Sequence, residues 1–335
     1  MAGINGSMAH LSDTLFTTAI ATYALAMVGY TAEYSFGKKE LRSGAKVATP
    51  ARELVGAGAP VLEKSPGFGE PPASAPAVRG SFAEKIGRWS VVLMVFGVLV
   101  HAGSIAVRGF AVDAVPWSNM YEFASVAGLV GVLAFLIVLW KAPSIRRLGG
   151  FILLPVIVLM FLAGTVWYSR AQPLVPALQS YWLAIHVTLA AVSEGAFMTS
   201  AVLTFLYLLS ARHARRPLKS TRLATLVSRL PSAETLDKAA YRVVAFSFPL
   251  YTVAVICGAI WAEAAWGRYW GWDPKETWAF IVWVIYACYL HARATAGWKG
   301  RAAAWINLTG FGAITFNFLV VNIVVSGLHS YAGLS

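Results

Sequence analysis

The residues best suited to chemistry lie in one aromatic segment, Trp266 to Trp278. Long apolar stretches flank this segment on both sides, and the charged sequence Asp-Pro-Lys-Glu interrupts it at residues 273–276. We interpret it as a short loop between two membrane helices, where it offers a flat apolar surface. The ligand that suits such a surface is flat, apolar and partly charged. The segment contains four tryptophans: Trp266, Trp270, Trp272 and Trp278.

Two of the six histidines can supply metal ligands beside this segment. His186 lies near the start of one apolar stretch, and His329 directly follows another. Imidazole is a good ligand for iron, and two neutral imidazoles can hold a haem iron from both faces while tryptophans pack on the porphyrin. The pattern therefore favours a haem site. The alternative is that each histidine is a polar anchor at the membrane surface.

Charged residues around the segment have two open interpretations each. Three basic side chains are predicted on the same side of the membrane, and they either pair with haem propionates or are exposed interfacial charges. Asp273 either shapes the turn before a proline or interacts with the haem edge. The three basic residues are Arg108, Arg268 and Lys275.

His291 belongs to a different depth of the membrane. It follows Trp278 by 13 residues on one predicted helix, which places it about 20 Å away along the axis. It cannot ligate an iron held at the aromatic segment. It is a functional candidate near the opposite surface, or an interfacial histidine beside Arg293. The remaining groups have no assigned role: His101 and Glu194, which are interior, and His10 and His213, which are expected to be solvated.

Composition identifies the elements that must position these residues. The chain has 335 residues, of which 58% are hydrophobic and 13% charged, and its mean hydropathy is +0.64. Soluble domains carry about 25% charged residues. Repeated apolar runs of about 20 residues predict an all-α polytopic membrane protein. We expect about eight transmembrane helices, at 14–35, 90–108, 119–140, 150–168, 180–210, 243–262, 277–296 and 303–327.

The net charge of +12 is distributed unevenly along the chain. With these helices, 23 of the 27 Lys and Arg residues fall on one side of the membrane. The positive-inside rule makes that side cytoplasmic. Both termini and the aromatic segment then lie outside the cytoplasm. We therefore read the basic excess as a sign of topology and expect membrane lipid, and no nucleic acid, as a partner.

Three regions are predicted. Residues 1–35 form the first transmembrane helix with an outer tail and no features of a cleaved signal peptide. Residues 36–89 are rich in Ala, Gly, Pro and charge, which predicts a flexible cytoplasmic linker. Residues 90–335 form a seven-helix domain. The two cysteines, Cys257 and Cys288, make no CxxC pair, so a thiol oxidoreductase is not expected.

The aromatic segment, of the form WGxxWxWDPKETW, resembles the tryptophan-rich WWD signature of haem-handling proteins. With its continuation to His291 it is similar to the CcsA (ResC) branch of system II cytochrome c biogenesis. Residues 116–123, 174–187 and 326–331 resemble that branch's outer segments, the last two around its external histidines. The resemblance extends from about residue 90 to the C-terminus, and 36–89 match nothing assignable.

This resemblance implies a function, stated here as an expectation. Haem b passes to the outer face, where its vinyl groups form thioethers with the CxxCH cysteines of an apocytochrome c. In the CcsA (ResC) branch, the residues that match His186 and His329 are external ligands of the haem iron. The residue that matches His291 is a transmembrane ligand, which is paired with a histidine of the partner protein. The chain would be part of a holocytochrome c synthetase with a separate CcsB (ResB)-type membrane partner. A thioredoxin-like thiol reductant is a further candidate partner, and a bacterial plasma membrane is favoured over a thylakoid.

Three rival functions are open at this point. A haem exporter or haem-binding module without a synthetase role would use the same ligands. A cytochrome b-type electron-transfer subunit would need paired histidines at two depths, for which this chain has too few deep histidines. A proton or ion channel has only Glu194 in its favour.

Overall fold

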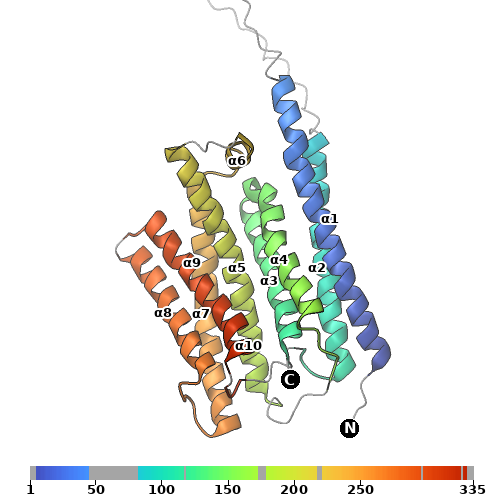
Figure 1. Cartoon of the computed structure of the whole chain (residues 1–335), viewed down its shortest axis with the longest axis vertical. Helices are drawn as coiled ribbons and strands as arrows, with labels where there is room; N and C mark the ends of the chain where they lie inside the picture. The colour runs from blue at the N-terminus through green and yellow to red at the C-terminus, as the bar shows by residue number, and fades with distance from the viewer. Residues whose placement is uncertain are drawn as a thin grey trace, which may run out of the picture.

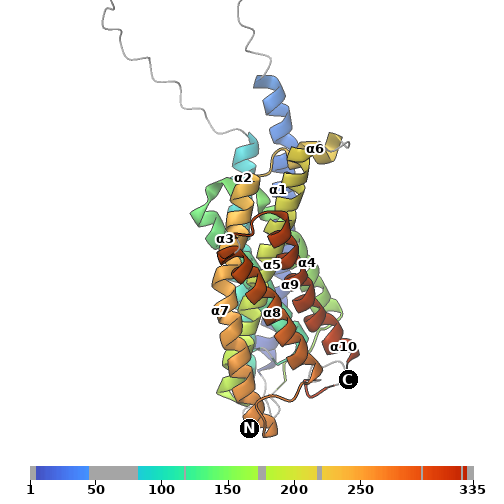
Figure 2. The same ribbon diagram turned by 90° about the vertical axis from the view of Figure 1, so that its left-hand side faces the viewer.

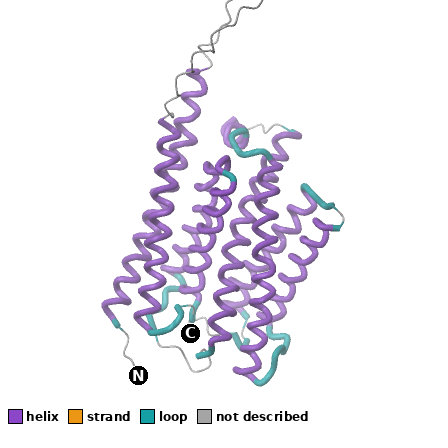
Figure 3. Tube along the Cα trace, turned by 180° about the vertical axis from the view of Figure 1, so that it is seen from behind, coloured by secondary structure: helices purple, strands orange, loops and turns teal. Residues whose placement is uncertain are grey.

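Helices make up almost all of the described chain. This computed structural model describes residues 5–44, 82–116, 118–172, 179–216, 221–295, 297–325 and 327–329. Within those ranges Figure 3 shows helices and loops and no strand, which confirms the predicted all-α class. The elements are α1 (Gly6–Gly44), α2 (Phe82–Val112), α3 (Met120–Lys141), the 3-10 segment η1 (Pro143–Leu148), α4 (Gly149–Thr165), α5 (Tyr181–Arg215), α6 (Thr221–Val227), α7 (Ala233–Trp266), α8 (Pro274–Ala294), α9 (Arg301–Phe316), the π-helical segment η3 (Asn317–Val321) and α10 (Asn322–Val324).

The chain is an integral, multi-pass membrane protein. Seven of the described helical stretches are long and apolar enough to cross a membrane, namely α1, α2, α3, η1–α4, α5, α7 and α9–α10. The predicted eighth span, α8, has 21 residues but is not among the seven. Charges at both its ends and tryptophans and tyrosines between them reduce its hydropathy. It nevertheless packs along α7 and α9 (Figures 1 and 2).

One end of the bundle carries the aromatic segment. The start of α1, the start of α5, the α7–α8 connection and residues 327–329 lie together at this end, which we call the loop end (Figure 1). The opposite end of the bundle carries the end of α3, the last turn of α5, α6 and the last turn of α8. Among the described residues, the basic segments predicted to share one side of the membrane therefore lie at one end of the bundle. That the loop end faces away from the cytoplasm stays a prediction.

The first helices extend further than the sequence predicted. α1 continues to Gly44, and α2 begins at Phe82, so 36–44 and 82–89 are helical where a flexible linker over 36–89 was expected. The rest of that linker, residues 45–81, lies outside the described residues. α2 packs along α1, and both stand on the flank of the bundle away from α8 and α9 (Figure 1).

α5 is the central helix of the bundle. Of its apolar stretch 67% is buried, against 44% at most for the other six membrane-spanning stretches. On one side it packs on α3, and on the other on α7 and α9. A stacked pair, Phe197 on Tyr286 with ring centroids 3.9 Å apart, ties α5 to α8. Side chains near the start of α5 are therefore held in the middle of the loop end.

Candidate functional site

A cavity with a volume of about 220 Å³ opens at the loop end between α3, α5, α7, α8 and the η3–α10 segment. Both predicted ligands, His186 and His329, line it, although they are 143 residues apart. Its walls are mostly apolar and aromatic, and a few charged and amide groups lie among them. The lining groups used below are His186, Glu194, Trp261, Trp270, Lys275 and His329.

His186 is oriented by the neighbouring helix α7. Its Nδ1 lies 2.7 Å from the Ala254 carbonyl oxygen, which can only accept a hydrogen bond. Nδ1 therefore carries the proton, and Nε2 of the neutral ring keeps its lone pair. Gly258 on α7 makes room for the ring, because a Cβ there would lie 2.7 Å from imidazole atoms. The outcome is a fixed imidazole with one nitrogen left to bind a metal.

His329 is oriented in the same way by a carboxylate. Its Nδ1 lies 2.9 Å from Asp273 Oδ2, and the Leu328 N–H donates to Oδ1 of the same carboxylate at 2.9 Å. Gly327 allows the close approach, because a Cβ at this position would lie 2.7 Å from Asp273 Oδ1. A carboxylate behind a histidine fixes the ring and makes it a stronger metal ligand. Asp273 therefore supports the second candidate ligand.

The protonation of this pair follows from burial and hydrogen bonding. Burial lowers the pKa of the His329 imidazole, although the hydrogen bond to Asp273 counteracts part of this effect. Burial alone would raise the pKa of the Asp273 carboxyl, but hydrogen bonds from Leu328 and His329 outweigh it and leave that pKa below its usual value. At neutral pH the pair is therefore a neutral imidazole donating to a carboxylate, with Nε2 of His329 unprotonated.

A tryptophan outside the predicted motif contacts both histidine rings. Trp261 on α7 is 2% exposed. Its ring is nearly parallel to the His186 ring, with centroids 6.5 Å apart, and meets the His329 ring at 5.9 Å. Trp266 also contacts His329, at 5.0 Å. The sequence did not single out Trp261, because an aromatic residue inside an apolar helix is usually an ordinary residue of the hydrophobic core.

The charged part of the aromatic segment is a helix start and not a free turn. Asp273 is the N-cap of α8, Pro274 occupies its first turn, and Glu276 completes a capping box. Glu276 Oε2 accepts the N–H groups of Gly271 and Asp273 at 2.8 and 3.1 Å. The residue order Asp-Pro-x-Glu is a known signal for a helix N-terminus. The predicted start at residue 277 was therefore three residues late.

The four tryptophans of the motif do not form one flat platform. Trp270 lines the cavity together with its neighbour Tyr269, whereas Trp272 is 66% exposed and meets Trp270 edge to face at 5.9 Å. Trp272 has a φ of 57°, a left-handed conformation that costs a bulky residue about 1–3 kcal/mol. Trp278 turns away and packs on Phe316 at 4.3 Å.

Of the three predicted basic partners, one lines the cavity. Lys275 does so, and its ammonium donates to the Asn322 side-chain oxygen. Arg268 lies 3.8 Å from Glu276 and folds over the aromatic segment. Arg108 is 3% exposed and bound to Glu122 at 2.6 Å, outside the cavity lining. The buried carboxylate of Glu122 is a partner that the sequence did not predict for Arg108, and a role of Arg108 at haem propionates stays a prediction.

The other titratable groups lie at three different positions in the bundle. His291 is exposed near the far end of α8, about 27 Å along the helix from Asp273, so the depth argument agrees with the structure. His101 is fully buried, with one ring nitrogen 2.9 Å from Ser125 Oγ and the other 3.4 Å from the Tyr23 hydroxyl. Both its nitrogens are therefore used inside the bundle. Glu194, two helical turns beyond His186 on α5, faces the cavity.

Taken together, the site offers two neutral imidazole nitrogens, tryptophan rings in contact with the imidazoles, and an ammonium group. Aromatic walls pack on the faces and edges of a flat ligand. Imidazoles supply axial bonds to its metal, and an ammonium pairs with carboxylates at its periphery. These three features fit an iron porphyrin with acidic side chains.

Comparison with known proteins agrees with this chemistry. The family described as cytochrome C assembly protein matches residues 117–329, which is more than half of the chain. The cytochrome c biogenesis protein CcsA of Guillardia theta is 36% identical over 265 residues, covering 75% of this chain and 86% of the relative. The CcsA proteins of Trieres chinensis and Gloeobacter violaceus are 37% and 34% identical, covering 66% and 71% of this chain and 78% and 84% of their own lengths.

Proposed function

Because the chain belongs to the cytochrome c assembly protein family and so acts in cytochrome c biogenesis, we propose that its loop-end cavity presents haem b for covalent attachment to apocytochrome c. The observation that carries this proposal is the pair of histidines, each with Nδ1 held by a hydrogen bond and Nε2 left for iron. His186 and His329 are the proposed axial ligands, Trp261, Trp266 and Trp270 pack around the porphyrin, and Lys275 meets a propionate.

The attachment reaction is an addition of a thiol to a vinyl group. The cysteine sulfur bonds to the inner vinyl carbon, and the thiol proton goes to the outer carbon, so no net oxidation or reduction occurs. Holding the porphyrin in one rotation brings its vinyl edge to the incoming CxxCH segment and removes most of the orientational cost. The substrate's own histidine then replaces one of the two protein ligands on the iron.

His291 belongs to a second proposed site, on the route by which haem reaches the cavity. Its exposed position near the far end of α8 leaves it open to another protein. We assign it a haem ligand role together with a histidine of a CcsB-type membrane partner, in a bacterial plasma membrane with the loop end outside.

Covalent attachment is the direct test of this function. The chain is co-expressed with a CcsB-type partner and an apocytochrome c, and haem that stays on the cytochrome after denaturing electrophoresis is measured. Loss of covalent haem in His186→Ala and His329→Ala supports the proposal. Covalent haem at the wild-type level in both variants contradicts it.

A haem exporter or haem-binding module without a synthetase role is the second candidate, because it needs the same ligands. The same co-expression separates the two functions. Free haem outside the membrane with no covalent product, in the presence of reduced apocytochrome, identifies export alone.

A further inference from the structure

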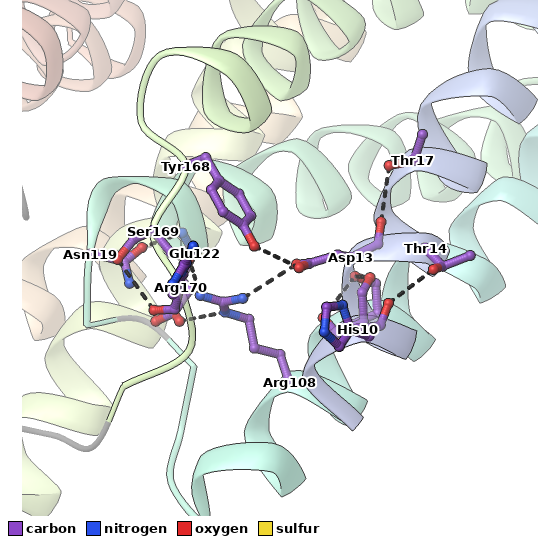
Figure 4. Close-up of polar contacts among 12 residues, drawn as sticks. His10, Asp13, Thr14, Thr17, Arg108, Asn119, Glu122, Tyr168, Ser169 and Arg170 are labelled. Carbon is purple, nitrogen blue, oxygen red and sulfur yellow. Dashed lines mark hydrogen bonds and ion pairs between the residues drawn. The ribbon is translucent and has the colours of Figure 1, made fainter. Parts of the chain in front are cut away.

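A buried charge cluster joins four segments at the loop end (Figure 4). The Arg108 guanidinium on α2 donates to Glu122 Oε1 on α3 at 2.6 Å and to the Ser169 carbonyl after α4 at 2.5 Å. It also lies 3.6 Å from Asp13 on α1, whose carboxylate accepts the Tyr168 hydroxyl at 2.6 Å. Arg108 and Glu122 are 3% and 4% exposed. We call these groups the Arg108 cluster.

One branch of the Arg108 cluster leads directly to the cavity. The second oxygen of Glu122 accepts the Ser118 N–H at 2.8 Å and the Ser118 hydroxyl at 3.0 Å. The Asn119 side chain caps α3 by accepting the Glu122 N–H at 3.0 Å. Ser118, Asn119 and Met120 all line the cavity. Glu122 therefore connects Arg108 with the segment that forms this wall.

A second branch runs through the segment after α4. Ser169, whose carbonyl binds Arg108, lies two residues after Trp167, which is 5% exposed and meets the Phe318 ring at 5.6 Å. Phe318 stacks on Phe123 at 5.2 Å, and both of these rings line the cavity. Both branches thus end on the part of the cavity lining formed by α3 and η3, whereas His186 and Trp261 belong to the part formed by α5 and α7.

We infer that Arg108 and Glu122 are positioning residues that set the α3–η3 wall against the His186 wall. In this role α1 and α2, which precede the family match at residue 117, help to determine the width of the haem cavity. The inference rests on the proposed function of that cavity. Neither residue touches haem; both act through Ser118, Asn119, Phe123 and Phe318.

The test compares this cluster with a matched ion pair at the opposite end. The side chain of Glu33 on α1 is 1% exposed and binds Arg146 of η1 at 2.7 Å, and neither residue lines the cavity. Full-length wild type, Arg108→Gln, Glu122→Gln and the control Glu33→Gln are purified, given hemin, and compared by absorption, by EPR of the ferric low-spin signal and by thermal midpoint. Ser118→Ala, which removes one hydroxyl donor to Glu122, is the milder variant if the charge variants do not fold.

The expected result is a several-fold loss of hemin retention and shifted low-spin g-values in Arg108→Gln and Glu122→Gln, with a smaller shift in the same direction in Ser118→Ala. Glu33→Gln lowers the thermal midpoint but keeps the wild-type spectrum. Wild-type spectra in every folded variant of the cluster would overturn the positioning role. A wild-type protein that forms no low-spin haem complex contradicts the proposed function itself, which is a separate outcome.

Discussion

At the scale of single residues, the site depends on what lies behind each candidate ligand. A backbone carbonyl of α7 holds His186, and Asp273 holds His329. The sequence allowed the two histidines to be predicted, because their depth follows from the apolar runs. Their supporting partners are 68 and 56 residues away, and no local pattern predicts such contacts. For the same reason the ion pair between Arg108 and Glu122 was not predicted from the sequence.

Asp273 can be tested apart from the ligands. Replacing it by Asn keeps the size of the side chain but removes the charge that strengthens the His329 imidazole. We expect Asp273→Asn to lower haem affinity by about 10- to 100-fold, the usual effect of losing such a partner. Hemin titration of the purified variant measures this. An affinity equal to that of wild type would mean that Asp273 is only a helix cap.

The pKa values predict a dependence of stability on pH. Burial lowers the pKa of His329 in the folded protein. In the unfolded chain the same imidazole binds a proton below about pH 6.5, so protonation favours the unfolded chain. The neutral histidine therefore contributes stability above that pH, and this contribution is lost as the pH falls toward its lower folded value. The difference in thermal midpoint between wild type and His329→Gln should change below about pH 6.5. If the difference in thermal midpoint stayed constant between pH 8 and pH 5, the lowered pKa of His329 would be refuted.

At the scale of elements, the start of α8 shapes the aromatic segment. Glu276 joins the N-terminus of the helix to the N–H groups of Gly271 and Asp273. The long helices themselves were predictable from their apolar runs, since a spanning segment must satisfy its own backbone. The start of α8 was misplaced because the motif was read as an aromatic loop, although Asp-Pro-x-Glu is a helix-start signal.

Glu276→Ala should therefore destabilise the aromatic segment, residues 266–278. We expect a loss of about 1 kcal/mol in stability, typical of a removed cap, together with weaker haem retention. Glu276→Gln is the matched control, because Gln can accept the same backbone hydrogen bonds. Thermal unfolding with and without hemin measures both effects. Equal behaviour of the Ala and Gln variants would show that the capping box is not what holds the segment.

In the whole molecule, the bundle separates the two positions that we propose to bind haem. The cavity lies at the loop end, and His291 lies in the last turn of α8, away from its start at Pro274. Composition and charge were enough to predict the helical class and this separation. The pairing of α1 with α2 and the contact between the Arg108 cluster and the cavity wall depend on tertiary packing, which composition does not contain.

The proposed orientation is open to labelling in intact cells. In a chain whose two cysteines are replaced by Ala, Tyr269→Cys at the loop end should react with a membrane-impermeant maleimide. Leu223→Cys in α6 should react only after permeabilisation, because it lies at the basic end. The reverse pattern would invert the topology and place the cavity on the cytoplasmic side.

We propose above all that His186 and His329 bind one haem iron together. The most direct measurement is the absorption and EPR spectrum of the purified, hemin-loaded protein, compared with His186→Ala and His329→Ala. We expect a low-spin bis-histidine spectrum in wild type, its loss in either variant, and its return when imidazole is added. A wild-type spectrum in either variant without imidazole would contradict it.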